Sequence, residues 1–162
     1  AFGKACREQK IPQKLIIAGN VDPEASGLER LIAELNLKNR ILFTGYFSEN
    51  HTGELVALYQ AADLYVDPSL YEGFGFQVVE AMACGIPVIA SNVTSLPEVI
   101  GDAGILVNPR DVEGWAGAIS RLLTDTGLRE SMRQRSMEQA KSFTWERTAR
   151  QTLEIYNKLL LN

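Results

Sequence analysis

Basic residues are missing from the middle of this sequence. No Lys or Arg occurs from Ile41 to Pro109, although eight Asp or Glu residues fall there. The whole chain carries a net charge of −4 at pH 7. Nucleic-acid-binding domains gather Lys and Arg on one face, so this balance argues against a nucleic-acid partner. If the central stretch binds a phosphate, backbone N–H groups must do much of the binding there.

Cysteine, histidine and long apolar runs are scarce too. Cys6 and Cys84 show no metal-ligand spacing, and the single histidine, His51, lies in a polar segment typical of a solvated loop. We therefore expect no metal and no cofactor, and two free cysteines indicate a reduced, cytoplasmic setting. No apolar run approaches the roughly 18 residues that a membrane span needs, and no signal peptide is visible.

What the sequence does contain is the composition of an ordinary globular domain. Its 162 residues are 46% hydrophobic and 22% charged, which suits one domain with a sizeable core. The first residue is Ala1 rather than Met, and the residues after it already have a helical pattern. We therefore expect a domain cut from a longer protein.

Short apolar segments alternate with amphipathic ones along the chain. Strands are expected at residues 15–18, 41–44, 64–66, 88–90 and 104–107. Helices are expected at residues 2–9, 28–37, 54–62, 76–84, 96–100, 111–123, 128–141 and 145–160. This order predicts an α/β fold, a Rossmann-like, doubly wound parallel sheet with helices on both faces.

Three polar loops follow the expected strands. Ligands bind such sheets beyond the carboxyl ends of the strands. The loops at Gly45–Tyr46, at residues 68–75 and at residues 91–95 all begin there. We expect them to converge on one cleft.

The helix expected at residues 76–84 is almost wholly apolar, which predicts burial nearly all round. Gln77 and Glu80 are its polar exceptions, three positions apart and so on one face. Because Glu is rarely buried without a partner, the pair indicates a stripe that faces a polar cleft. The alternative is that Glu80 merely stabilises the positive end of the helix.

A glycine loop, Glu72-Gly73-Phe74-Gly75, precedes this helix. Glycines allow positive φ and close approach of a ligand to the backbone, and a helix N-terminus offers free N–H donors. The loop therefore suits a phosphate or diphosphate, with a plain tight turn as the alternative. Glu80 can accept hydrogen bonds from ribose hydroxyls, while Glu72 can reach a group beyond the phosphates.

The segment from Glu72 to Val88 resembles the Glu-x7-Glu signature of the retaining group 1 glycosyltransferases (family four), which have the GT-B fold. Residues 58–69, residues 95–104 and Phe143-Thr-Trp-Glu146 resemble the flanking signatures. The resemblance covers nearly the whole chain. It implies that residues 1–162 form the C-terminal, nucleotide-sugar-binding half of a two-domain enzyme.

The resemblance also implies roles for particular residues. Glu80 would bind the donor ribose, and Glu72 would be the catalytic candidate, positioning the transferred sugar and stabilising charge near it. Backbone groups of Gly73, Phe74, Gly75 and Phe76 would hold the diphosphate and sugar, and Gly45, Tyr46, Ser69 and Leu70 would surround the base. The partners implied are a nucleoside-diphosphate sugar and an unidentified acceptor.

One departure from the family pattern bears on activity. Family members carry an Arg and a Lys, on the strand and helix that open this domain, which pair with the donor diphosphate. We expect that strand, and the acceptor-binding N-terminal domain, to lie outside residues 1–162. The chain alone is therefore expected to bind donor without transferring the sugar. Any contact with a membrane surface would be made by the absent domain.

Other readings stay open. The chain is alternatively a non-catalytic module for nucleotide diphosphates, or a structural assembly domain. An apolar stripe on the last helix favours the assembly domain, and its members are Leu153, Tyr156, Leu159 and Leu160. A phosphorylase or an epimerase on the same fold matches the motifs less well. Trp115 and Trp145 are expected to be packing anchors.

Overall fold

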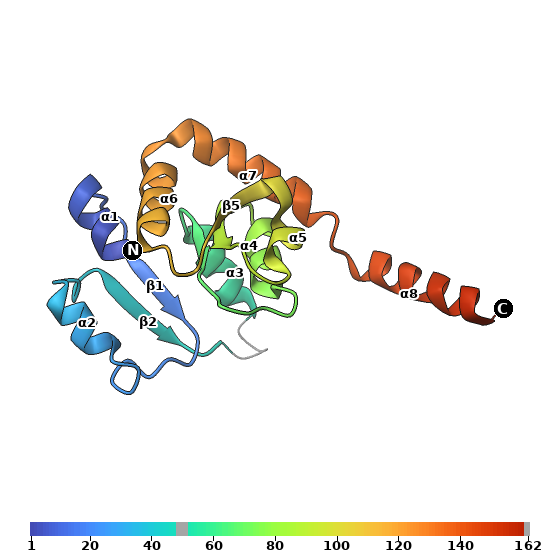
Figure 1. Cartoon of the computed structure of the whole chain (residues 1–162), viewed down its shortest axis with the longest axis horizontal. Coiled ribbons are helices and arrows are strands. Elements are labelled where there is room, and N and C mark those ends of the chain that lie inside the picture. Colours follow the sequence, from blue (N-terminus) through green and yellow to red (C-terminus); the bar gives the residue numbers. More distant parts are fainter. Residues whose placement is uncertain (48–51, 161–162) are drawn as a thin grey trace.

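The computed structural model of this chain describes residues 1–47 and 52–160 (Figure 1). His51 lies outside the described residues, so its place in a solvated loop stays a prediction. The strands are β1 (Leu15–Ala18), β2 (Ile41–Gly45), β3 (Tyr65–Asp67), β4 (Val88–Ser91) and β5 (Gly104–Val107). The helices are α1 (Phe2–Gln9), α2 (Leu28–Glu34), α3 (Thr52–Ala61), α4 (Phe76–Ala83), α5 (Leu96–Ile100), α6 (Val112–Thr124), α7 (Thr126–Ala140) and α8 (Trp145–Leu160), with a 3-10 turn, η2, at Gly101–Ala103.

The expected elements are present, with their ends shifted by a few residues. The helix expected at residues 28–37 ends at Glu34, because Asn36 has a φ of 55° and leaves the helical conformation. Asp111 is the N-cap residue of α6, and its carboxylate accepts a hydrogen bond from the Gly114 N–H at 2.9 Å. Local signals for helix ends therefore operate as the sequence indicates.

All strand pairs are parallel, and the predicted α/β class is confirmed. β1 pairs with β2, β3 pairs with β4 and β4 pairs with β5. The strands form two sheets, β1-β2 and β3-β4-β5, rather than the single sheet that the sequence suggested. In the described part of the chain, no backbone pairing joins β1 to β3. The two groups of strands are also separate in Figure 1.

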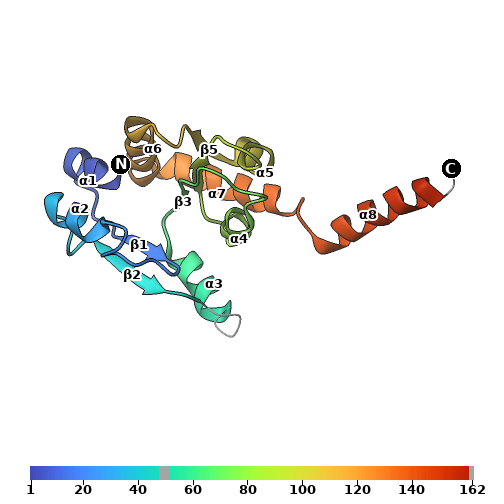
Figure 2. The ribbon, with the colours of Figure 1, turned by 60° about the horizontal axis from the view of Figure 1, so that its bottom comes forward.

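The three-stranded sheet is covered on both faces. Val88 and Ala90 of β4 pack in a core with Met82 of α4. Ile89, between them in sequence, packs with Trp115 of α6 instead, because successive strand residues point to opposite faces. Figure 2 shows α4 and α6 on opposite sides of these strands. The loops after β3 and β4 therefore extend from a rigid, fully packed layer.

The two-stranded sheet is covered less completely. Ile16 of β1 is 42% exposed and Leu42 of β2 is 47% exposed. α2, the helix beside this sheet, has no buried residue. An apolar cavity of about 200 Å³ lies between α1, α2 and the two strands, lined among others by Phe2, Ile17 and Leu31. This half of the fold is loosely packed.

α8 projects away from the rest of the molecule in both views (Figures 1 and 2). It has no buried residue, and the predicted stripe of Leu153, Tyr156, Leu159 and Leu160 is exposed. Within residues 1–47 and 52–160, no helix combines the length and the apolar character needed to cross a membrane.

The two tryptophans differ. Trp115 is buried, and its Nε1 donates to the Asn108 carbonyl oxygen at 3.0 Å, so its prediction as a packing anchor is confirmed. The same prediction for Trp145 is wrong, since Trp145 is 75% exposed at the start of α8. The reason is that α8 leaves the body at this residue and has no core to enter.

Candidate functional site

The candidate site is built first from the loop between β3 and α4. Asp67 ends β3 and is buried, and its Oδ1 accepts a hydrogen bond from the Ser69 N–H at 3.1 Å. The Ser69 hydroxyl donates to Glu72 Oε1 at 2.9 Å. The Glu72 carboxylate is thus held by a short chain of contacts that begins in the sheet.

The loop after β4 fixes the same segment from the other side. The Glu72 N–H donates to Thr94 Oγ1 at 3.1 Å. The Ser95 hydroxyl lies 3.0 Å from the Glu72 carbonyl oxygen and 3.1 Å from the Phe74 carbonyl oxygen, so one proton serves one or the other. Two of the three loops expected to converge are therefore joined directly.

The third loop, Gly45–Tyr46, follows β2 in the other sheet. Tyr46 is 74% exposed, and none of the described hydrogen bonds joins it to the other two loops. Leu70 is also exposed, whereas Ser69 is half-buried in the contact with Glu72. A shared role for Gly45, Tyr46 and Leu70 around a base stays a prediction.

The two glycines of the loop differ in what they require. Gly75 has a φ of 97° and is buried, and a Cβ there would lie 2.8 Å from Leu96 Cδ2. Gly73 is outside the set of positive-φ glycines, and a Cβ there would meet nothing within 4 Å. Gly75 therefore serves positive φ, whereas the missing side chain of Gly73 leaves open space above the backbone.

α4 begins at Phe76 with an uncapped N-terminus. Gly75 is the N-cap residue, no side chain caps the helix, and the first turn contains no acidic residue. The first N–H groups of a helix have no partner within the helix. They carry a partial positive charge, so this end of α4 is suited to an anion.

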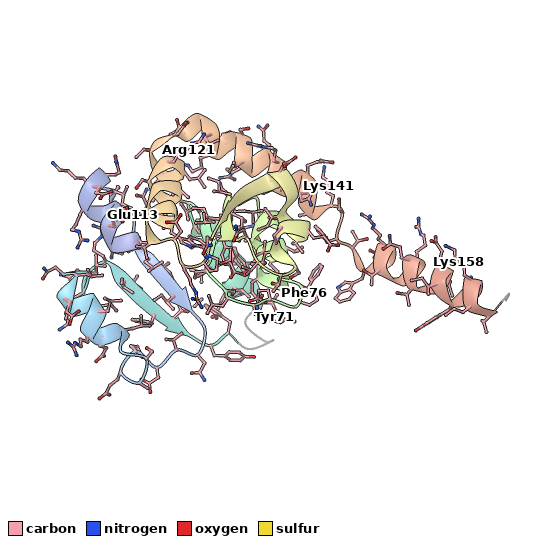
Figure 3. The ribbon with its side chains drawn as sticks, viewed as in Figure 1. Tyr71, Phe76, Glu113, Arg121, Lys141 and Lys158 are labelled. Carbon is pink, nitrogen blue, oxygen red and sulfur yellow. The ribbon has the colours of Figure 1, made fainter. Side chains whose placement is uncertain are left out.

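Aromatic rings surround this helix end. The Phe74 ring lies 4.9 Å from the Phe76 ring and 5.7 Å from the Phe143 ring, centroid to centroid. Phe76 stacks on Trp145 at 6.2 Å with an interplanar angle of 27°. Figure 3 shows Phe76 on the side of the body from which α8 departs. The glycine loop is thus connected through rings to the start of α8.

Glu80 lies on the exposed side of α4. The expectation that this helix is buried nearly all round is wrong, because Phe76, Gln77, Glu80 and Ala83 form an exposed face. Val78, Ala81 and Met82 are the buried residues. Gln77 and Glu80 are both exposed on this face, and that they face a polar cleft stays a prediction. Among the described residues, the Tyr59 hydroxyl donates a hydrogen bond to Glu80 Oε2 at 3.1 Å.

Three carboxylates gather around the Tyr65 side chain. Burial raises the pKa of the Tyr65 hydroxyl, and the negative charges of Asp67, Glu72 and Glu80 raise it further. None of these three carboxylates takes part in an ion pair within the described residues. The site is therefore negatively charged apart from the N-terminus of α4, and an anionic ligand has to be held by backbone N–H groups or by cations from another segment.

Four contributors to the site were not identified from the sequence: Tyr59, Asp67, Thr94 and Ser95. Tyr59, Thr94 and Ser95 act through partners distant in the chain, whereas Asp67 acts locally, on the Ser69 N–H two residues on. Tyr59 and Asp67 do lie within residues 58–69, the segment that carries a flanking signature. In the described part of the chain, no group of three or more His, Cys, Asp or Glu side chains is arranged to hold a metal ion.

Comparisons with known proteins agree on one family. A family model described as "Glycosyl transferases group 1" matches residues 1–139. The O-antigen chain mannosyltransferase B of Escherichia coli is 41% identical over 152 residues, which is 94% of this chain and 39% of that protein. The chain therefore spans well under half the length of this relative.

Solved structures give the same fold. Sucrose-phosphate synthase from Thermosynechococcus elongatus has 35% identity and a TM-score of 0.81, covering 98% of this chain and 42% of that chain. The Anabaena protein HepE, solved in complex with UDP-glucose, has 24% identity and a TM-score of 0.81, covering 97% of this chain and 44% of that chain. Such neighbours are GT-B glycosyltransferases, which confirms the predicted fold class.

Proposed function

The chain belongs to the glycosyl transferases of group 1, and from that premise we propose that it is the donor-binding domain of a retaining glycosyltransferase. The donor is a nucleoside-diphosphate sugar. The bond from the sugar C1 to the diphosphate oxygen breaks and the nucleoside diphosphate leaves with the bonding electrons, while a bond forms from C1 to an acceptor hydroxyl oxygen, whose proton passes to the departing diphosphate oxygen. We further propose that the chain belongs to family four of such enzymes.

One observation carries the proposal: two carboxylates flank a rigid glycine loop at the uncapped N-terminus of α4. Phosphates bind at helix N-termini because free N–H groups and the helix dipole both favour negative charge. Glu80, four residues into the helix, accepts hydrogen bonds from the ribose, and Glu72 faces the sugar beyond the phosphates. HepE, a protein of the same fold, was solved with UDP-glucose, which is a ligand of this class.

Gly73 supports the proposal independently. Its backbone conformation does not require glycine, and no atom of the described residues, apart from Gly73 and its chain neighbours, lies within 4 Å of the position that a Cβ would occupy. A ligand that approaches the backbone closely is a reason for glycine at such a position. In the proposed complex this space belongs to the diphosphate or the transferred sugar.

Glu72 acts in this proposal as a positioning and charge-stabilising group. Its contacts to Ser69 and Thr94 fix it before the donor arrives, and preorganised charge is most effective where charge develops in the transition state. In the proposed transfer the sugar leaves the diphosphate and meets the acceptor on the same face, which gives retention. We assign no covalent intermediate to Glu72.

The longer protein supplies what the site lacks. We propose that a segment outside residues 1–162 brings cations to the donor diphosphate and that another domain binds the acceptor. The uncompensated carboxylates of the site support the need for such cations. By itself the chain binds donor without transferring the sugar. A cytoplasmic location is part of the proposal, supported by the free thiols of Cys6 and Cys84.

Calorimetric titration of the chain with UDP, GDP and ADP tests donor binding. One of the three should bind, Glu80→Ala should weaken that binding, and Gly73→Ala should weaken it while leaving the unfolding midpoint unchanged. In the longer protein, Glu72→Ala should lower kcat more than it raises KM for the donor. Absence of binding by all three nucleotides, or unchanged kinetics in both Glu variants, would contradict the proposal.

A second candidate function is a non-catalytic or assembly domain. The exposed apolar face of α8 favours it, because large exposed apolar patches often mark interaction sites. Light scattering over a range of concentrations distinguishes the two candidates. A mass that rises with concentration, together with no nucleotide binding, would favour assembly over donor binding.

A further inference from the structure

A hydrogen bond from Tyr59 to Glu80 joins helix α3 to helix α4. Tyr59 lies on α3, and its hydroxyl donates to Glu80 Oε2 at 3.1 Å, while the Gln77 carbonyl oxygen lies at 3.5 Å. A phenol has one proton, and the shorter contact to a charged acceptor is the stronger one. The bond therefore joins α3 directly to the carboxylate that the proposed function assigns to the ribose.

The Tyr59 ring is held in place by its surroundings. It is the buried residue of α3, and its ring meets the Tyr65 ring edge-on at 5.9 Å with an interplanar angle of 62°. Burial, and then the nearby Tyr65 and Glu80, raise the pKa of the Tyr59 hydroxyl far above its usual value. The hydroxyl consequently stays protonated and remains a donor throughout the neutral pH range.

The other oxygen of the carboxylate is in a different situation. Glu80 is exposed, and its Oε1 accepts no hydrogen bond from the described residues. A carboxylate on an exposed helix face would otherwise rotate among several orientations, at a cost in entropy when a ligand fixes it. The buried Tyr59 hydroxyl fixes Oε2 of Glu80, and Oε1 is left for a ligand.

We propose that Tyr59 is a positioning residue for Glu80: it holds Oε2 so that Oε1 is oriented toward the ribose hydroxyls of the donor. This inference rests on the proposed function. It makes recognition of the ribose a joint property of α3 and α4, rather than of the Glu alone. Discrimination between a ribose and a sugar without its hydroxyls then depends on Tyr59, which does not touch the donor.

The rival explanation is that Tyr59 merely anchors α3 to the core. Tyr59→Phe separates the two, because it keeps the buried ring and removes only the hydroxyl. The matched control is Tyr65→Phe, which removes a hydroxyl from the ring packed against Tyr59. The Tyr65 hydroxyl makes no hydrogen bond to Glu80 in the described part of the chain. A purely structural role changes stability without changing which sugars the nucleotide site prefers.

The experiment measures calorimetric Kd values for whichever of UDP, GDP and ADP binds the wild-type chain and for its 2′,3′-dideoxy counterpart. Tyr59→Phe should weaken binding of the ribonucleotide by about fivefold to tenfold, as the loss of one hydrogen bond predicts. Binding of the dideoxy nucleotide should be unchanged. The Kd of the dideoxy nucleotide divided by the Kd of the ribonucleotide should therefore fall. Tyr65→Phe should keep the wild-type ratio. An unchanged ratio in Tyr59→Phe overturns the proposal.

A second measurement tests the contact without any ligand. Tyr59→Phe should lower the urea midpoint of the wild-type chain, and should lower it less when Glu80 is already Ala. Equal losses in the two backgrounds would show that the bond does not form and would overturn the inference. If the wild-type chain binds none of UDP, GDP and ADP, the proposed function fails, and this comparison alone decides the Tyr59–Glu80 contact.

Discussion

The two sheets of this fold are made of similar residues and are packed very differently. β4 reads Val-Ile-Ala-Ser and β1 reads Leu-Ile-Ile-Ala. Every residue of β4 is buried, whereas alternate residues of β1 are exposed. α4 and α6 bury apolar residues against the three-stranded sheet, but α2 buries none and lies beside a cavity. The difference is therefore in the coverage of the strands.

Both candidate carboxylates belong to the well-covered half. Glu72 lies in the loop between β3 and α4, and its N–H contacts Thr94 in the loop after β4. Glu80 lies on α4 and contacts the buried Tyr59. A site that has to hold its groups in fixed geometry is best supported by a packed layer. The two-stranded half offers Gly45 and Tyr46 on a less constrained edge, so it contributes fewer fixed contacts.

The two halves should differ most in how much free energy of unfolding is lost when an apolar strand residue is shortened to Ala. Ile89→Ala, in the middle of β4, should lower the free energy of unfolding by about 2–5 kcal/mol, because it leaves a cavity in a close-packed core. Ile16→Ala, in β1, should lower it by about 1 kcal/mol or less, because its side chain is 42% exposed. Urea unfolding followed by circular dichroism measures both values.

Equal losses for these two variants would show that β1 is as well packed as β4 in solution. Hydrogen exchange gives an independent check. Amides of β1 and β2 should exchange faster than those of β4, because loosely packed regions open at lower free energy. Similar protection in both sheets would remove the distinction between them.

Two positive-φ glycines give the next largest difference. Gly75→Ala should cost about 1–3 kcal/mol, since its φ is 97° and the new Cβ would lie 2.8 Å from Leu96 Cδ2. Gly45→Ala should lower the free energy of unfolding by only about 1 kcal/mol, the strain of placing Ala in the left-handed conformation. Its φ is 75°, and no described atom beyond its chain neighbours lies within 4 Å of its Cβ position. Thermal and urea unfolding of the two variants should rank them in that order, and the reverse order would contradict the packing difference.

The sequence predicted the elements well and the division of the sheet not at all. Apolar runs such as residues 15–18 and 88–90 predict buried strands because both have the same residue types. Burial itself depends on which helices cover the strands, and that depends on contacts between distant segments. Pairing between β1 and β3 is likewise a matter of tertiary geometry, so nothing local indicated two sheets.

Two serines that lie close to a pair of carbonyl oxygens offer a smaller, more local comparison. Ser95 joins the two loops of the site through the Glu72 and Phe74 carbonyl oxygens. Ser26 contacts the Asp22 and Pro23 carbonyl oxygens in an exposed turn before α2. Ser95→Ala should cost about 0.5–1.5 kcal/mol and weaken nucleotide binding. Ser26→Ala should change stability by about 0.5 kcal/mol or less and leave binding unchanged.

Calorimetry of both serine variants with the nucleotide that binds the wild type checks this prediction. If Ser95→Ala binds nucleotide as tightly as Ser26→Ala, the link between the two loops has no part in the site. Urea midpoints measured on the same samples show whether a change in binding arises from unfolding alone.

The site itself could be predicted only in part. Glu72, Glu80 and the glycine loop were identified because their spacing around a helix start is local. Their supports were missed because Ser95 and Thr94 reach the loop from another strand, and Tyr59 reaches Glu80 from another helix. The different roles of Gly73 and Gly75 could not be assigned from the sequence, because it shows that a residue is glycine but not whether φ or a neighbouring atom requires it.

The smallest effect is expected where α8 leaves the body. Trp145 is 75% exposed and stacks on Phe76, so Trp145→Ala should lower the free energy of unfolding by less than about 1 kcal/mol, the loss of one exposed aromatic pair. Trp115 is 4% exposed. In Trp145→Ala the tryptophan fluorescence comes from this buried indole alone, so its emission maximum should lie at a shorter wavelength than that of the wild type. A loss of several kcal/mol, or emission that does not shift, would place Trp145 in a packed core and make α8 part of the well-covered half.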